Sequence, residues 1–261
     1  MLVKTDQEIE WLRASALLVS KTLAEVGSMV CPGVTTFDLD RRAEEYIRDN
    51  GAKPGFKGYH GFPNTLCTSV NGQVVHGIPN RNTVLKEGDI VSVDCGVVWN
   101  RYYGDSAYTF PVGEVSESTR RLLQVTKECL FKGIEAAIAR NRIGDIAWAV
   151  QQHAESNTFS VVRELVGHGI GTNMHEDPEV PNYGRRGCGS RLRKNMVICI
   201  EPMINKGRKD VVEEKDGWTI RTKDNQPSAH FELTVAIGEQ KADVLSTFAF
   251  IDEKLKLNLA S

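Results

Sequence analysis

Three carboxylates interrupt stretches of sequence that otherwise favour β-strands. Asp94 lies in VSVDCGVV, Glu201 in VICIEPMI and Glu232 in HFELTVAI, each among branched apolar residues. Such stretches enter a sheet and lose water on at least one face, where an isolated carboxylate is costly. A structural ion pair with arginine explains any one of these acids about as well as a functional role does. It explains all three together poorly, because these strands supply no cations of their own.

A fourth acid, Asp105, follows Asp94 by eleven positions. One continuous strand would place the two on opposite faces, whereas a hairpin can place them on the same face. The midpoint between them precedes Asn100-Arg101, which is the better turn dipeptide, so we expect a bulge or a longer turn using Gly104. Two anions on one face repel each other. Either one of them takes a proton or a multivalent cation lies between them.

Three histidines bear on that choice. His168 is surrounded by glycines in VGHGIG, His175 follows seven positions later, and His76 precedes a glycine in VVHGIP. A single histidine is more often a core or surface residue than a ligand, but these occur in a chain with several stranded acids. Oxygen ligands with one imidazole suit Mn, Fe(II), Co or Zn. Two such ions, roughly 3.5–4 Å apart, activate a water and polarise a substrate oxygen. The predicted reaction class is therefore hydrolysis.

The elements that must position these residues begin with two helices. A capping box at Thr5 and Glu8 predicts a helix over about 6–27. A Pro-Gly break follows at 30–34, and a second helix is expected over about 36–50, ending at Gly51. Loops with short strands then cover 52–82, and strands over 89–98 and 102–112 form the hairpin.

The same order then recurs. Ser116 or Ser118 caps a predicted helix that runs to about 139, and after a break at 140–144 a shorter helix covers about 145–156. Strands and loops with buried acids follow again. Because corresponding elements lie about 110 positions apart, we expect an internal duplication with repeats at about 1–113 and 114–261. This favours a single two-lobed domain over 1–261, with a site between the lobes.

Bulk composition excludes several classes of protein. The chain has 261 residues, 41% hydrophobic and 25% charged, with a formal net charge of −2. It therefore has no overall basic field for nucleic acid, and its longest apolar runs are too short for a membrane span. The N-terminus lacks the apolar core of a signal peptide. Six cysteines without a CxxC pair predict free thiols in a cytoplasmic protein.

Five motifs together resemble the type I methionine aminopeptidases of bacteria, over essentially the whole chain. They are YHGFPNTLCTSVNGQVVHGIP, the aspartate pair Asp94 and Asp105, GHGIGTNMHEDP, IEPM and HFELTVAI. The resemblance implies an α+β pita-bread fold, shared with prolidase and creatinase. Its duplicated lobes are related by a pseudo-two-fold axis, and its curved antiparallel sheet is covered by helices. The interval from His168 to Glu201 has no room for the helical insertion of the type II enzymes.

The resemblance implies a dinuclear centre of Co, Mn, Fe(II) or Zn. Asp105 and Glu232 would bridge the ions, Asp94 would chelate one, and His168 with Glu201 would complete the other. A bridging water would attack the first peptide carbonyl, and Glu201 would relay its proton. His175 would donate to the carbonyl oxygen, and His76 would contact the peptide nitrogen beyond the scissile bond. Such donors and cations stabilise charge that develops on oxygen.

The resemblance also implies the binding sites around the metals. The walls of the methionine pocket would be Tyr59, Phe62, Cys67 and Trp218, with Phe56 and Met174 nearby, and such walls suit an unbranched thioether. A monovalent cation, Na or K, would lie near Asn71, Gln73 and Ser228. The implied activity is removal of the N-terminal methionine from nascent chains by a monomer, with a preference for a small uncharged second residue.

Two alternative functions share this fold. A proline-directed peptidase shares the fold but carries an additional N-terminal domain, and an inactive relative that binds protein or RNA would have lost ligands that are present here. The basic stretch 185–194 is more consistent with a solvated loop than with a docking surface. A further hypothesis is that this stretch helps the protein dock on the ribosome. No membrane and no specific nucleic acid is expected as a partner.

Overall fold

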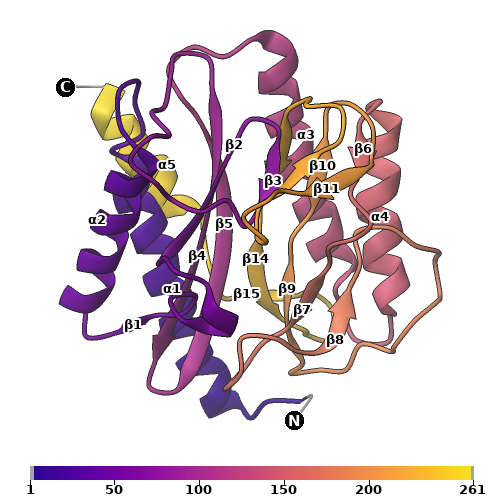
Figure 1. The fold of residues 1–261 in the computed structure, drawn as a ribbon. Coiled ribbons are helices and arrows are strands. Elements are labelled where there is room, and N and C mark those ends of the chain that lie inside the picture. The colour runs from indigo at the N-terminus through magenta and orange to yellow at the C-terminus, as the bar shows by residue number, and fades with distance from the viewer. Residues whose placement is uncertain (1–2, 260–261) are drawn as a thin grey trace.

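Helices cover the strands from two sides (Figure 1). The computed structural model describes residues 3–259. Helices α1 (Asp6–Gly27), α2 (Thr36–Asp49) and α5 (Ala249–Leu259) lie on one side, and α3 (Glu117–Ala136) and α4 (Ile143–Ser156) lie on the other. None of the described helices has the length and apolar character needed to span a membrane. All six cysteines are free.

The ends of the helices follow local capping chemistry. The capping box of Thr5 and Glu8 is present at α1, and Thr35 with Asp38 forms a second one at α2. Ser116, not Ser118, caps α3, because its hydroxyl accepts from the Thr119 amide at 3.2 Å. This helix ends at Ala136, three residues before the predicted end. The last helix, α5, was not predicted.

The described strands form four small sheets, in which the strand pairings are antiparallel. One contains β4 with β1, β2 and β5, another has the order β15-β14-β9-β7-β8, and two three-stranded sheets have the orders β13-β10-β6 and β11-β12-β3. The first-half strands are β1 (Lys53–Pro54), β2 (Leu66–Val70), β3 (Gln73–Val75), β4 (Ile90–Trp99) and β5 (Tyr102–Pro111). The second-half strands are β6 (Ser160–Val161), β7 (Gly167–Gly169), β8 (Glu176–Val180), β9 (Val197–Ile200), β10 (Met203–Asn205), β11 (Val211–Glu213), β12 (Ile220–Thr222), β13 (Ser228–His230), β14 (Leu233–Ala236) and β15 (Asp243–Val244).

The β4–β5 hairpin is regular over its whole length. It pairs Ile90 with Pro111 at one end and Trp99 with Tyr102 at the other, without a register shift. Asn100 and Arg101 form the turn with positive φ angles of 47° and 71°, as a two-residue hairpin turn requires. The predicted bulge is therefore wrong.

This register places the two aspartates on one face without any irregularity. Asp105 pairs with Gly96, and Gly96 lies two residues from Asp94 on the same strand. Since side chains two residues apart on a strand point to the same face, Asp94 and Asp105 are diagonal neighbours. The midpoint between Asp94 and Asp105 in the sequence lies off the centre of the turn because the two residues are diagonal neighbours, and not because the hairpin contains a bulge.

Gly104 serves a different purpose from the predicted one. It lies in regular β5, and a Cβ there would come within 2.5 Å of the Ser15 backbone in α1. The missing side chain lets α1 pack directly on the hairpin, and the Ser15 hydroxyl donates to the Tyr102 carbonyl at 3.0 Å. The hairpin that carries both aspartates is thereby held against the longest helix.

The two halves of the chain are joined through their strands. Strand β12 of the second half pairs with β3 of the first half, and the Glu232 amide donates to the Ala107 carbonyl at 2.9 Å. Each half has the order helix, helix, strands, which is consistent with the predicted duplication. The α+β class with antiparallel sheets under helices is confirmed.

Candidate metal centre

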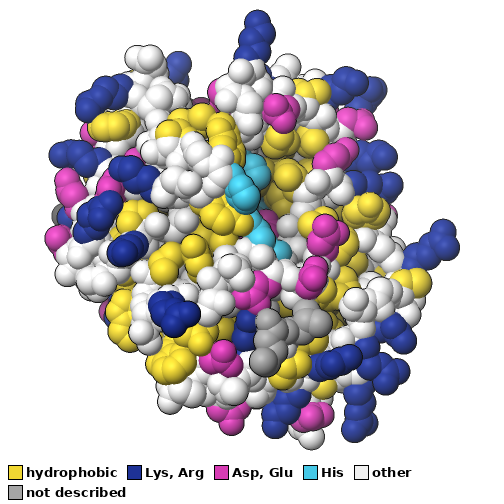
Figure 2. Space-filling view, turned by 60° about the horizontal axis from the view of Figure 1, so that its bottom comes forward, with side chains coloured by type: hydrophobic (Ala, Val, Ile, Leu, Met, Phe, Trp, Pro, Cys, Tyr) yellow, Lys and Arg dark blue, Asp and Glu magenta, His cyan; other side chains and the backbone are white. Residues whose placement is uncertain are grey.

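The five predicted ligands line one cavity of about 350 Å³. Asp94 and Asp105 come from the hairpin and His168 from β7, while Glu201 is the residue after β9 and Glu232 the residue before β14. The cavity therefore collects side chains from both halves. A wider hollow of about 840 Å³ adjoins it and shares Val166, His168 and His175. Figure 2 shows histidines in this hollow with acidic side chains beside them.

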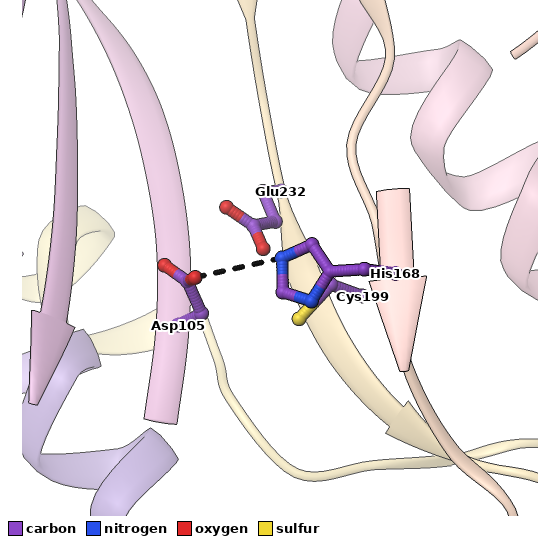
Figure 3. Close-up of side chains that lie close together, drawn as sticks. All are labelled: Asp105, His168, Cys199 and Glu232. Carbon is purple, nitrogen blue, oxygen red and sulfur yellow. Dashed lines mark ion pairs between the residues drawn. The ribbon is translucent and has the colours of Figure 1, made fainter. Parts of the chain in front are cut away.

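Ligand atoms of four of the five residues fall in two overlapping clusters, the second of which joins Glu201, His230 and Glu232. One atom each from Asp105, His168, Cys199 and Glu232 all fall within 4.8 Å of one another. His168 Nε2 lies 3.7 Å from both Asp105 Oδ2 and Glu201 Oε1. Figure 3 shows the Asp105 and Glu232 carboxylates and the His168 ring pointing toward one another from separate segments of the chain.

The buried acids lack the partners that a structural role would supply. Asp94 Oδ1, Asp105 Oδ1 and Glu232 Oε1 are buried without a hydrogen-bond partner. Among the described residues, no ion pair joins any of the four acids to lysine or arginine; their titratable neighbours are one another and the histidines His168 and His230, whose pKa values burial lowers. Buried polar atoms in native proteins are normally satisfied. The arginine-pair explanation is therefore not supported here.

The burial of these four acids also changes their pKa values. Burial raises the pKa of Asp94 to about 6. Burial, followed by repulsion from neighbouring acids, raises the pKa values of Asp105, Glu201 and Glu232 well above their usual range. A bound multivalent cation reverses this effect, because it stabilises the ionised carboxylates. Four carboxylates and one imidazole fit divalent ions that accept oxygen and nitrogen ligands.

Cys199 lies in the same cluster but was not predicted. Burial and the nearby acids Glu232 and Asp105 raise the pKa of its thiol well above the usual value. Unlike the five predicted ligands, Cys199 is not among the described residues that line the cavity. Its Sγ lies 3.5 Å from Thr234 Oγ1. We therefore assign Cys199 to the packing behind the ligands.

Two further histidines near the cavity were missed. His230 is 1% exposed, and its Nε2 lies 3.4 Å from Glu201 Oε2. Its position two residues before Glu232 was a usable signal, because alternate residues of a strand share a face. His60 lines the cavity with a positive φ of 47°. No local pattern in the sequence identifies it.

His76 and His175 both line the cavity, as predicted. Burial lowers the pKa of His76 to about 4 and also lowers the pKa of His175. Both rings are therefore neutral at pH 7, and each can donate one hydrogen bond. The His175 ring lies edge-on to that of His168, with centroids 4.3 Å apart.

Most of the predicted methionine pocket lines the cavity beside the acids. Its walls are Phe56, Tyr59, Phe62, Cys67 and Trp218, joined by Val75, Leu165 and Met203, which were not predicted. Phe62 and Trp218 meet edge-to-face at 5.1 Å. Met174 is fully buried behind this wall, where its Cε and the Phe56 ring occupy the space that a side chain on Gly96 would need.

The residues predicted for a monovalent cation lie near the turn between β2 and β3. The Ser228 amide donates to the Asn71 carbonyl at 2.9 Å, and Gln73 Oε1 accepts from the Val70 amide at 3.0 Å. The structure thus brings Asn71 and Ser228 together from opposite halves of the chain. A cation at this point stays a prediction.

The fold and the cluster of ligands define a metal-dependent peptidase. The sequence pattern of metallopeptidase family M24 matches residues 10–239, and the chain belongs to this family. The methionine aminopeptidase of Clostridium acetobutylicum is 50% identical over 246 residues, which are 94% of this chain and 98% of that protein. The methionine aminopeptidase structure from Thermotoga maritima has 44% identity and a TM-score of 0.93, covering 95% of this chain and 100% of that one.

A more distantly related structure also matches this chain. The prolidase from Pyrococcus furiosus is 23% identical with a TM-score of 0.75, and the match covers 94% of this chain but 65% of the prolidase. It shares the pita-bread fold. The predicted resemblance to methionine aminopeptidases and the class of metallo-aminopeptidase are confirmed.

Proposed function

We propose that this chain removes the N-terminal methionine from nascent proteins and peptides whose second residue is small and uncharged. The observation that carries the proposal is a single cavity in which the five ligands adjoin apolar walls. An unbranched thioether packs well against aromatic rings. A free amino group at the ligand end would fix the first residue, so that the first peptide bond is the one presented for hydrolysis.

Two divalent ions would be held by Asp94, Asp105, His168, Glu201 and Glu232, with Asp105 and Glu232 shared between them. When bound, the ions would polarise the first carbonyl and make water a stronger nucleophile near neutral pH. Co, Mn, Fe(II) and Zn all suit this ligand set. Na or K near Asn71, Gln73 and Ser228 would stabilise the backbone next to the hairpin.

The chain's own residues would position the substrate and move protons. Glu201 would take the proton of the attacking water and pass it to the leaving amine. His175 would donate to the carbonyl oxygen as negative charge develops there. His76 would hold the peptide nitrogen beyond the scissile bond. Because burial lowers the pKa values of both histidines, both rings would be neutral, so that His175 can donate through one nitrogen and His76 can accept from the peptide N–H.

The proposed setting is the cytoplasm, where a monomer would meet chains as they emerge during synthesis. Docking on the ribosome through the basic loop 185–194 would require free cations. The loop is exposed, and one of its cations, Arg186, lies over the Trp148 ring at 4.2 Å. The loop backbone is held by Arg142, which donates to the Gly189 carbonyl at 2.8 Å.

The deciding experiment is a tripeptide assay after removal of bound metal by a chelator. Adding back Mn, Co or Fe(II) should restore release of methionine from Met-Ala-Ser. Met-Lys-Ser and an acetylated Met-Ala-Ser should be poor substrates. Cleavage of X-Pro dipeptides without cleavage of Met-Ala-Ser would identify a proline-directed peptidase instead. No turnover of either class with any of the metals would favour a binding protein.

A further inference from the structure

The Tyr59 hydroxyl lies 2.8 Å from Nδ1 of His175, across 116 positions of sequence. Tyr59 stands in a short turn, Tyr59–Gly61, that follows a left-handed Gly58. The Gly58 amide donates to the Phe62 carbonyl at 2.8 Å, and the Tyr59 amide donates to the Phe56 carbonyl at 2.9 Å. The His60 ring packs edge-on to the Tyr59 ring, with centroids 4.4 Å apart. The position of the phenol is therefore fixed from several sides.

Tyr59 supplies the only hydrogen bond to the His175 ring among the described residues. The neighbouring rings are Tyr59 and His168, and no acid in the described part of the chain forms an ion pair with His175. With Nδ1 engaged by the phenol, Nε2 is the nitrogen left for a ligand in the cavity. The proton carried by Nε2 decides whether it can donate.

A neutral imidazole carries its proton on one nitrogen, and the partner of the other nitrogen selects which one. A carboxylate only accepts hydrogen bonds, so a carboxylate at Nδ1 would keep the proton there and leave Nε2 as an acceptor. A phenol can donate to Nδ1 and leave the proton on Nε2. Burial raises the pKa of Tyr59, so the phenol keeps the proton that it donates.

We infer that Tyr59 is a positioning residue that holds His175 as the Nε2–H tautomer, ready to donate to the carbonyl oxygen of the substrate. This inference rests on the proposed function for its catalytic consequence, and it adds to the role of Tyr59 as a wall of the cavity. In the reaction, the Nε2–H bond points at the oxygen on which charge develops, while the Tyr59 hydroxyl keeps Nδ1 from taking the proton.

The direct test is the tautomer of His175, read from two-bond proton–nitrogen correlations in NMR spectra of the ¹⁵N-labelled protein. The wild type should show Nε2 protonated. Tyr59→Phe, which keeps the ring and removes the hydroxyl, should give a mixture of tautomers. Tyr183→Phe removes a hydroxyl from an exposed tyrosine and should leave the His175 signals unchanged. A wild-type ring protonated on Nδ1, or an unchanged tautomer in Tyr59→Phe, would overturn the inference.

Kinetics on Met-Ala-Ser add a second readout. Losing part of an oxyanion donor's contribution should lower kcat at least about tenfold in Tyr59→Phe, with KM changed less than about twofold because the aromatic wall remains. In a His175→Ala background the same change should cost almost nothing, since Tyr59 acts through His175. Equal losses in both backgrounds would refute the inference. If no methionyl peptide is cleaved, the proposed function fails, whereas the tautomer result stands independently.

Discussion

The backbone carbonyl of each of the two proposed bridging ligands, Asp105 and Glu232, accepts a hydrogen bond from a hydroxyl that lies near the other ligand in the sequence. The Ser106 hydroxyl donates to the Glu232 carbonyl at 2.6 Å, and the Thr234 hydroxyl donates to the Asp105 carbonyl at 2.8 Å. Each half of the chain thus fixes the ligand of the other half. All four residues are buried, so water does not compete for these bonds.

Removing one of these hydroxyls should loosen the centre without removing a ligand. We expect Thr234→Val to weaken Mn binding by about tenfold or more, as loss of outer-sphere support usually does. Titration calorimetry of the metal-free protein measures this. Thr126→Val is the matched control, because Thr126 donates within α3 to the Leu122 carbonyl and is equally buried. A similar loss of affinity in both variants would point to general destabilisation.

The buried acids should contribute a stability to the metal-free protein that falls as pH rises, opposite in sign to the contribution of the buried histidines. The pKa of Asp94 in the folded chain is about 6, above its unfolded value of about 3.9. The folded state therefore binds the proton of Asp94 more strongly than the unfolded state does, and the contribution of Asp94 to the free energy of unfolding decreases with rising pH. Asp105, Glu201 and Glu232 shift in the same direction.

Thermal unfolding with chelator and with Mn at pH 5, 6 and 7 separates this effect from other titrations. The gap in Tm between the two conditions should widen with pH, because bound metal needs ionised carboxylates. Metal binding should also release protons, seen as a dependence of the binding heat on the buffer. A gap that stays constant over this range would contradict the raised pKa values.

Replacing Glu201 by glutamine should remove a proton carrier while keeping the shape of the side chain. We expect kcat for Met-Ala-Ser to fall at least about a hundredfold, with far-ultraviolet circular dichroism unchanged. The amide cannot accept a proton from water, although it keeps an oxygen toward the cavity. A near-normal rate in Glu201→Gln would remove this residue from the mechanism.

A buried ion pair should make a measurable contribution to stability next to His175. Lys4 Nζ lies 2.6 Å from Glu176 Oε2, and the two side chains are 6% and 12% exposed. Lys4→Met strands the Glu176 charge and should lower the free energy of unfolding by about 3 kcal/mol. The double variant Lys4→Met/Glu176→Gln should recover part of that loss in urea unfolding, because no uncompensated charge remains. A double variant less stable than Lys4→Met would reverse this account.

Local sequence patterns predicted the parts of this molecule that depend on neighbours in the chain. The capping box at Thr5 and the hairpin around Asn100 follow from a few adjacent residues, and the structure confirms them. Of the three acids expected inside strands, Asp94 lies in β4, whereas Glu201 and Glu232 lie just outside the ends of β9 and β14. The role of Gly104 was misassigned, because the packing of α1 on β5 depends on residues about 90 positions apart and leaves no local pattern. The contact between Tyr59 and His175 was missed for the same reason.

The pairing of β3 with β12 also has a consequence for the order of events during synthesis. Strand β3 is complete by Val75, but its partner Ile220–Thr222 is made much later, together with Trp218 and Glu232. Until then β3 presents an open edge, and the cavity lacks a wall and a shared ligand. The enzyme that we propose to trim other emerging chains would itself emerge inactive, and would gain its site only when its last quarter leaves the ribosome.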